Sequence, residues 1–177
     1  LVQGRDFTDN DLRAEYLNFV KNIIYQRAKA DGVDRDLLTE AEEQLDQMTV
    51  TPFAHLLGYP QLNDGTANPL LVLANLPFRT IITTSPFTFI EQALIKAGKT
   101  PHTVVCRWRE DLRNVIDEGI DDRYKPDKEH PLVYHLFGIE DHSNSLVLTE
   151  DDYLDFLVDV SENRGDEARD SVHALVR

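Results

Sequence analysis

Three short apolar or β-branched runs in the second half of the chain constrain its fold more than any other feature. They cover 79–84, 102–107 and 131–137, and segments with a helical spacing of apolar residues lie between them. Compact β-branched runs that are bounded by turn residues are typical of buried strands. Strands that alternate with helices predict a mostly parallel sheet covered by helices, so the expected class is α/β.

The first half of the chain carries helical patterns only. One pattern begins at Asp9 or Asn10, both good N-cap residues, and ends near Gly32. A second pattern runs over 37–48. These patterns predict two helices before the first strand.

The region that follows is expected to form short turns, with a helical turn among them. Pro52 marks the beginning of this region, and Pro69 suits the first turn of a short helix over 70–75. No linker or repeat interrupts the chain. The expected organisation is one domain over 1–177, with a helical part (1–75) and a strand and helix part (76–165).

Helices are also expected around the strands. Apolar residues at helical spacing over 87–97, followed by Gly98, predict a helix between the first two strands, and a weaker pattern covers 112–116. Thr149, followed by acidic residues, predicts the cap of a last helix. The side chains expected to face inward on this helix are Tyr153, Leu154, Leu157 and Val158.

The overall charge argues against nucleic acid as a partner. The chain has 177 residues and a formal net charge of −14, and no basic stripe offsets its acidic patches. A phosphate backbone would be repelled. No apolar run reaches the roughly 18 to 20 residues that span a bilayer, so no membrane partner is expected.

Cys106 is the one cysteine of the sequence. A single thiol excludes an internal disulfide and any zinc site built from two or more thiolates, and it favours a reducing, cytoplasmic location. We expect Cys106 to be a small buried apolar residue, and we expect no metal site. The first residue, Leu1, is not a Met, so the chain is expected to be a segment of a longer one.

Polar residues follow the first and third predicted strands. In an open parallel sheet, ligands bind beyond the carboxyl ends of the strands. This rule places the turn of Thr83, Thr84 and Ser85 and the turn of His135 to Gly138 in one crevice. A simple turn with a helix cap, and a satisfied core histidine, are the structural alternatives for the two segments.

The same segments resemble a known family. Thr83 to Ser85, His135 to Gly138 and Ser145 to Tyr153 are similar to motifs of the sirtuin-like domains of bacterial antiphage defence proteins, and the resemblance covers Leu70 to Val160. It implies a Rossmann-like fold that is incomplete at both ends of this chain, with at least one further strand expected on each side, and it implies the binding or hydrolysis of NAD. It also implies partners among other domains of a longer chain, a protein partner or further copies of the chain in a homo-oligomer.

Three departures from the active members bear on activity. The family's Gly-rich opening turn is absent, Ser85 stands where active members have Asn, and Phe137 stands where they have the His that acts as a base. A phenyl ring cannot transfer a proton. His135 is expected on the same face of its strand as Phe137, but roughly 6 to 7 Å further back.

Three functions therefore remain open. The leading hypothesis is an NAD-site domain with degenerate catalytic positions that serves assembly, sensing or regulation. The first alternative is an active NAD hydrolase with Ser85 and His135 as catalytic residues, and the second is an interaction module that needs no cofactor. Zinc-dependent deacylation would need four cysteines. The residues expected to face the cofactor are Thr83, Thr84, Ser85, His135, Phe137 and Gly138.

Overall fold

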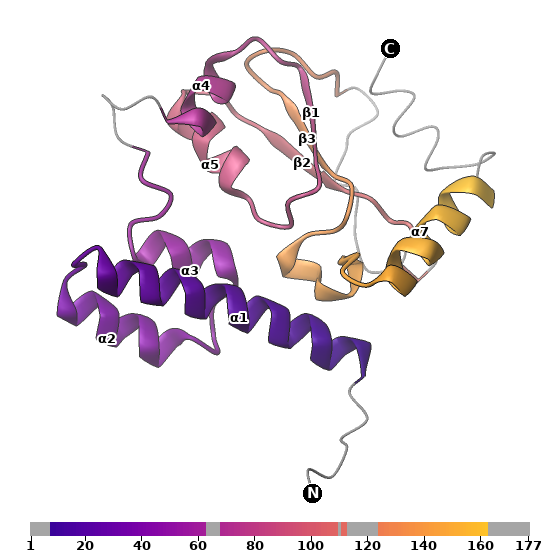
Figure 1. Cartoon of the computed structure of the whole chain (residues 1–177). Coiled ribbons are helices and arrows are strands. Elements are labelled where there is room, and N and C mark those ends of the chain that lie inside the picture. Colours follow the sequence, from indigo (N-terminus) through magenta and orange to yellow (C-terminus); the bar gives the residue numbers. More distant parts are fainter. Residues whose placement is uncertain (1–7, 63–67, 110, 113–123, 163–177) are drawn as a thin grey trace, which may run out of the picture. The chain divides into compact units, whose positions relative to one another are not determined.

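A computed structural model describes residues 8–62, 68–109, 111–112 and 124–162 of the chain (Figure 1). The chain separates into two compact units, Leu1–Pro60 and Gln61–Arg177. The expectation of one domain over 1–177 stays a prediction. The weak helix predicted over 112–116 lies largely outside the described residues.

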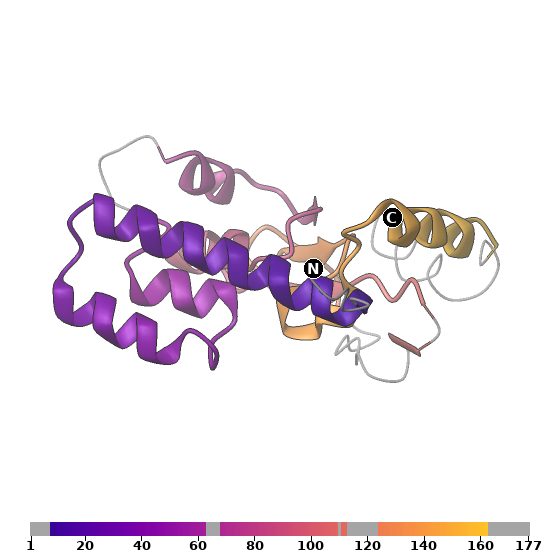
Figure 2. The ribbon, with the colours of Figure 1, turned by 60° about the horizontal axis from the view of Figure 1, so that its bottom comes forward.

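The first unit is helical, as predicted. Its helices are α1 (Asp9–Ala30), α2 (Arg35–Gln44) and α3 (Val50–Leu56), and α1 lies alongside the other two in both views (Figure 1, Figure 2). Thr8 caps α1, because its hydroxyl accepts a hydrogen bond from the backbone N–H of Asp11. The buried side chains shared by the three helices are Ala28, Ala41, Phe53 and Leu57.

Helix α3 is longer than the single helical turn expected among short turns. Its third residue is Pro52. The first turn of a helix has no intrahelical partner for its backbone N–H groups, so a proline there removes no helical hydrogen bond. Pro52 is therefore compatible with α3, and a helix begins where turns were expected.

A buried lysine links two helices of the first unit. Lys21 of α1 is 5% exposed, and its ammonium donates to the backbone carbonyls of Leu45 and Met48, which follow α2. We expect Lys21→Met to lower the free energy of unfolding by about 2 kcal/mol, because the carbonyls lose a charged donor. Urea unfolding of the whole chain, followed by circular dichroism, measures this loss.

The matched control is an exposed lysine of the same helix. Lys29 is exposed and lies in the last turn of α1, where a positive charge interacts favourably with the helix dipole. Lys29→Met should cost less than about 1 kcal/mol. Equal losses for the two variants would show that the buried contacts of Lys21 add no stability.

The second unit contains the predicted parallel sheet. Strands β1 (Thr80–Thr83), β2 (His102–Val105) and β3 (Leu132–His135) are parallel, and their order in space is β1-β3-β2. Helices α4 (Pro69–Asn75) and α5 (Phe89–Lys96) accompany them (Figure 1). The α/β class with a Rossmann-like sheet and a helical N-terminal half is confirmed.

The central strand β3 is buried on both faces. Val133 packs in a cluster with Ala74 of α4 and with Ala93 and Leu94 of α5. The neighbouring residues Leu132 and Tyr134 pack in a different cluster, which also contains Trp108 and Phe156. Since successive side chains of a strand point to opposite faces, helices and loops cover both sides of the sheet.

Helix α7 (Glu150–Glu162) begins as predicted. Thr149 accepts a hydrogen bond from the backbone N–H of Asp152, and the Asp152 carboxylate accepts from the N–H groups of Leu148 and Thr149. This is a reciprocal cap.

Cys106, also as predicted, is a buried apolar residue at 4% exposure, and burial raises the pKa of its thiol.

The predicted inward face of α7 is wrong. Among the residues of α7 whose burial is described, Asp152 and Phe156 are buried; they lie four positions apart and so on one face of the helix. The Asp152 carboxylate must reach the backbone before the helix, and this requirement rotates the apolar stripe outward. The exposed residues are Tyr153 (44%), Leu154 (57%), Leu157 (44%) and Val158 (52%).

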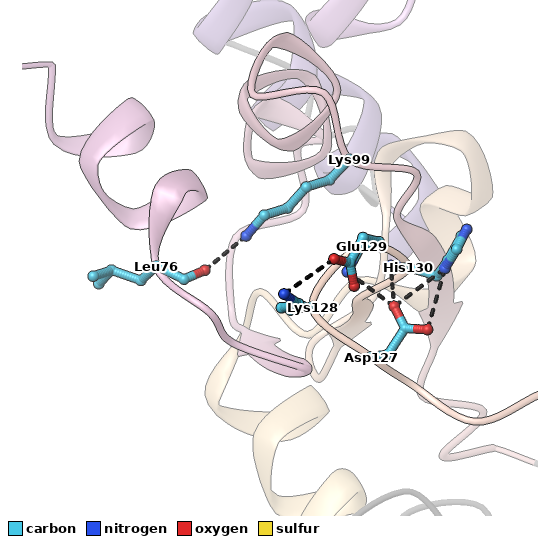
Figure 3. Close-up of polar contacts among 6 residues, drawn as sticks. All are labelled: Leu76, Lys99, Asp127, Lys128, Glu129 and His130. Atoms are coloured by element: carbon cyan, nitrogen blue, oxygen red, sulfur yellow. Dashed lines mark hydrogen bonds and ion pairs between the residues drawn. The ribbon is translucent and has the colours of Figure 1, made fainter.

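The loop that leads into β3 is held by one carboxylate. Figure 3 shows that Asp127 accepts hydrogen bonds from the backbone of Glu129 and His130 and lies 3.1 Å from the His130 ring. The backbone hydrogen bond from His130, more than any other contact, lowers the pKa of Asp127. In the same view, the ammonium of Lys99 donates to the Leu76 carbonyl at 2.6 Å. These contacts fix the amino ends of the strands.

None of the helices in the described part of the chain is long and apolar enough to cross a membrane. Among the same residues, no three His, Cys, Asp or Glu side chains are placed to hold a metal ion together.

Candidate functional site

The carboxyl ends of β1 and β3 lie side by side. Thr83 is in register with His135, and the backbone N–H of Leu136 donates to the Thr83 carbonyl at 2.8 Å. Beyond the strands, the N–H of Glu140 donates to the Pro86 carbonyl at 3.0 Å. The structure therefore brings together the two turns that were expected to share a crevice.

Two hydroxyl groups stabilise the turn after β1. The Thr83 hydroxyl, on a residue only 8% exposed, accepts from the backbone N–H of Ser85 at 3.0 Å. The Ser85 hydroxyl accepts in turn from the N–H of Phe87 at 3.3 Å. Thr84 is exposed and Ser85 is partly exposed. The turn thus presents Thr84 and part of Ser85 outward, while Thr83 serves the fold.

His135 is fully buried, and both of its ring nitrogens have a partner. Nδ1 lies 2.8 Å from the backbone carbonyl oxygen of Ser85, and Nε2 lies 2.7 Å from Oε1 of Glu91 in α5. The Thr103 hydroxyl of β2 donates to the same Oε1 at 3.1 Å. A polar network therefore joins the turn after β1 to β2, β3 and α5.

The sequence reasoning missed Glu91 and Thr103. A signal for Glu91 was present, because it lies four residues after Phe87 and three before Leu94, both on the apolar stripe of the predicted helix. A carboxylate on such a stripe must be paired or hydrogen-bonded. Thr103 had no comparable signal, since threonine is common in strands.

Phe137 belongs to the apolar core. Its ring meets the ring of Phe156 edge-on at 5.3 Å and that of Tyr153 at 6.1 Å, and it packs against the cluster of Trp108. His135 faces Glu91 instead, so the expectation that the two side chains share a face is wrong. The alternation rule holds only within a strand, and β3 ends at His135.

Gly138 is required by close packing. It has φ of +87°, and a Cβ atom there would lie 2.2 Å from the carbonyl oxygen of Ser145. Ser145 ends the short helix η1 (Glu140–Ser145); its hydroxyl accepts from the Ile139 N–H, and its carbonyl accepts from the Trp108 indole. The stretch from Ser145 therefore supports the turn after β3 from behind.

The exposed hydroxyl groups of this site are better placed to contact a ligand than His135 is to transfer a proton. Thr84 and Ser85 offer hydroxyl groups at the carboxyl end of a parallel strand, where ligands of such sheets bind. The Gly138 backbone, by contrast, already has the Ser145 backbone against it. A general base needs a nitrogen or oxygen free to take a proton from the substrate, and both nitrogens of His135 are engaged.

One comparison with known proteins gives a match. A family model described as a SIR2-like domain matches residues 79–177, which is more than half of the chain and includes both turns. No curated protein matches the chain.

Proposed function

The chain belongs to the SIR2-like domain family, and from that premise we propose that it binds an NAD-type ligand at the Thr83–Ser85 turn without hydrolysing it. Members of this family are associated with NAD. In this proposal the domain serves assembly, sensing or regulation in a bacterial defence protein. The catalytic positions are degenerate.

The state of His135 supports this proposal over an active NAD hydrolase. The ring is 0% exposed, and its two nitrogens already contact the Ser85 carbonyl and the Glu91 carboxylate. To act as a base, the ring would have to leave both partners and reach the ligand through the turn. Phe137 stands at the position where active members have the His that acts as a base, and its ring packs against Phe156.

Two measurements on the whole chain test the proposal. With NAD in large excess, nicotinamide release should not exceed that of a blank. With millimolar ADP-ribose, the unfolding temperature should rise, because a ligand that binds only the folded state stabilises it, by about 2.7 kcal/mol at one hundred times Kd.

A pair of exposed threonines provides the matched control. Thr84→Asp places a negative charge at the turn and should abolish the stabilisation by ADP-ribose, whereas Thr100→Asp, before β2, should leave it unchanged. Sustained nicotinamide release that is lost in Ser85→Ala would overturn the proposal that the catalytic positions are degenerate, and it would favour an active NAD hydrolase. Absence of any stabilisation would favour an interaction module that needs no cofactor.

A further inference from the structure

Glu91 is an unusual residue to find inside this unit. It is 6% exposed and is the third residue of α5, near the positive end of the helix dipole. Its Oε1 contacts both His135 and Thr103, and its Oε2 is buried with no hydrogen-bond partner among the residues that the structure describes. Burial of a carboxylate costs free energy unless its charge is compensated. The contact with His135 is therefore what allows Glu91 to be buried.

The geometry fixes the number of protons in this contact. A backbone carbonyl can only accept, so the bond between His135 and the Ser85 carbonyl requires a proton on Nδ1. An unprotonated Nε2 and an ionised carboxylate are both acceptors and would repel at 2.7 Å. The Nε2–Oε1 contact therefore contains one further proton.

That proton belongs on the ring. An imidazole nitrogen is a stronger base than a carboxylate oxygen. The Thr103 hydroxyl donates to Glu91 and so favours an ionised carboxylate, while the Ser85 carbonyl accepts from the ring and so favours a cationic imidazole. Buried charges persist when they are paired and hydrogen-bonded in this way.

We propose that Glu91 is the positioning residue of the strand-end site: its carboxylate holds His135 as an imidazolium, and the imidazolium fixes the Ser85 carbonyl and hence the Thr83–Ser85 turn. The chain of contacts runs from α5 through the last residue of β3 to the turn after β1. The ion pair stands on geometry alone. Only its effect on a bound ligand rests on the proposed function.

Nitrogen NMR of the His135 ring tests the ion pair directly. In the wild-type chain at neutral pH, both ring nitrogens should give signals of the protonated type. In Glu91→Gln, the side-chain amide can donate to Nε2, so the ring should become neutral with an unprotonated Nε2. Rescue of the doubly protonated signature by Glu91→Asp would support an ionic role over simple packing.

The control is Thr103→Val, which removes the hydroxyl and leaves the carboxylate and the ring in contact. Its ring signals should match those of the wild type. An unprotonated ring nitrogen in the wild-type chain would overturn the ion pair, even if Glu91→Gln failed to fold. Identical ring signals in Glu91→Gln and wild type would overturn it as well.

The positioning role is measured with ADP-ribose. If the wild-type chain is stabilised by this ligand, Glu91→Gln should weaken its affinity by about tenfold, the lower end of the effect of residues that orient metal ligands. Thr103→Val should change the affinity much less. Equal affinity in Glu91→Gln and wild type would overturn the positioning role, whereas absence of binding in the wild type would overturn the proposed function and leave the NMR result standing.

Discussion

Replacement of Gly138 by alanine is expected to destabilise the chain by about 3 kcal/mol or more. A residue with a side chain in the left-handed region costs roughly 1–2 kcal/mol, and Gly138 has φ of +87°. The added Cβ would also lie 2.2 Å from the carbonyl oxygen and 2.4 Å from the carbonyl carbon of Ser145. Forcing atoms into packed space costs a further 1–3 kcal/mol, roughly. Urea unfolding of the intact chain measures the sum.

Gly98 offers a control that separates the two contributions. It has φ of +79°, almost the same as Gly138, but a Cβ there would meet no atom within 4 Å. Gly98→Ala should therefore cost only the backbone part, about 1–2 kcal/mol. Equal losses for the two variants would mean that the Ser145 segment moves away freely, and that it does not support the turn.

The second large effect is expected on breaking the pair of Glu91 and His135. Glu91→Ala should lower the free energy of unfolding by about 3–5 kcal/mol, because it removes one partner of a buried pair and leaves Nε2 of His135 without its hydrogen bond. His135→Ala should cost a similar amount, since it strands the carboxylate in the same way. Both losses are measured by urea unfolding of the whole chain.

The double variant Glu91→Leu, His135→Leu is the informative comparison. Replacement of a buried ion pair by apolar side chains is often close to neutral, so the double variant should be more stable than either alanine variant. If the loss in the double variant equals the sum of the losses in Glu91→Leu and His135→Leu alone, the two side chains contribute independently through packing. In that case the network would not be a coupled pair.

The strands of the sheet could be predicted from the sequence because composition and turn residues indicated the same elements. The run from Thr80 to Thr83 is β-branched throughout, and Gly98 stops the helix that follows, so strand and helix were both recognisable. The order β1-β3-β2 was not predicted, since it depends on which strands pair across long stretches of chain. Local patterns carry no information on that choice.

The face that a helix buries was harder to predict than the helix itself. On α7, counting apolar residues pointed to Tyr153 and Leu157, but the buried residues are Asp152 and Phe156. The cap decides the rotation, because the Asp152 carboxylate belongs to it. A cap that must reach two backbone N–H groups constrains the rotation of the first turn more than scattered leucines do.

The candidate site was predictable in place but not in its internal connections. That the turns after β1 and β3 meet follows from the parallel arrangement of neighbouring strands. The side chains of His135 and Phe137 lie on different faces because β3 ends at His135, and a sequence does not show the end of a strand to within one residue. The ends of elements are set by tertiary hydrogen bonds, which a sequence read locally does not display.

The order of the strands also has a consequence for how the chain folds during synthesis. The strand in the middle of the sheet, β3, is the last of the three to leave the ribosome, and within the described residues β1 and β2 each pair with β3 and not with each other. Until Leu132 to His135 emerge, both earlier strands lack the neighbour that satisfies their backbone groups. Unpaired strand edges invite association between nascent chains, so the first two strands of this unit depend on β3 for protection.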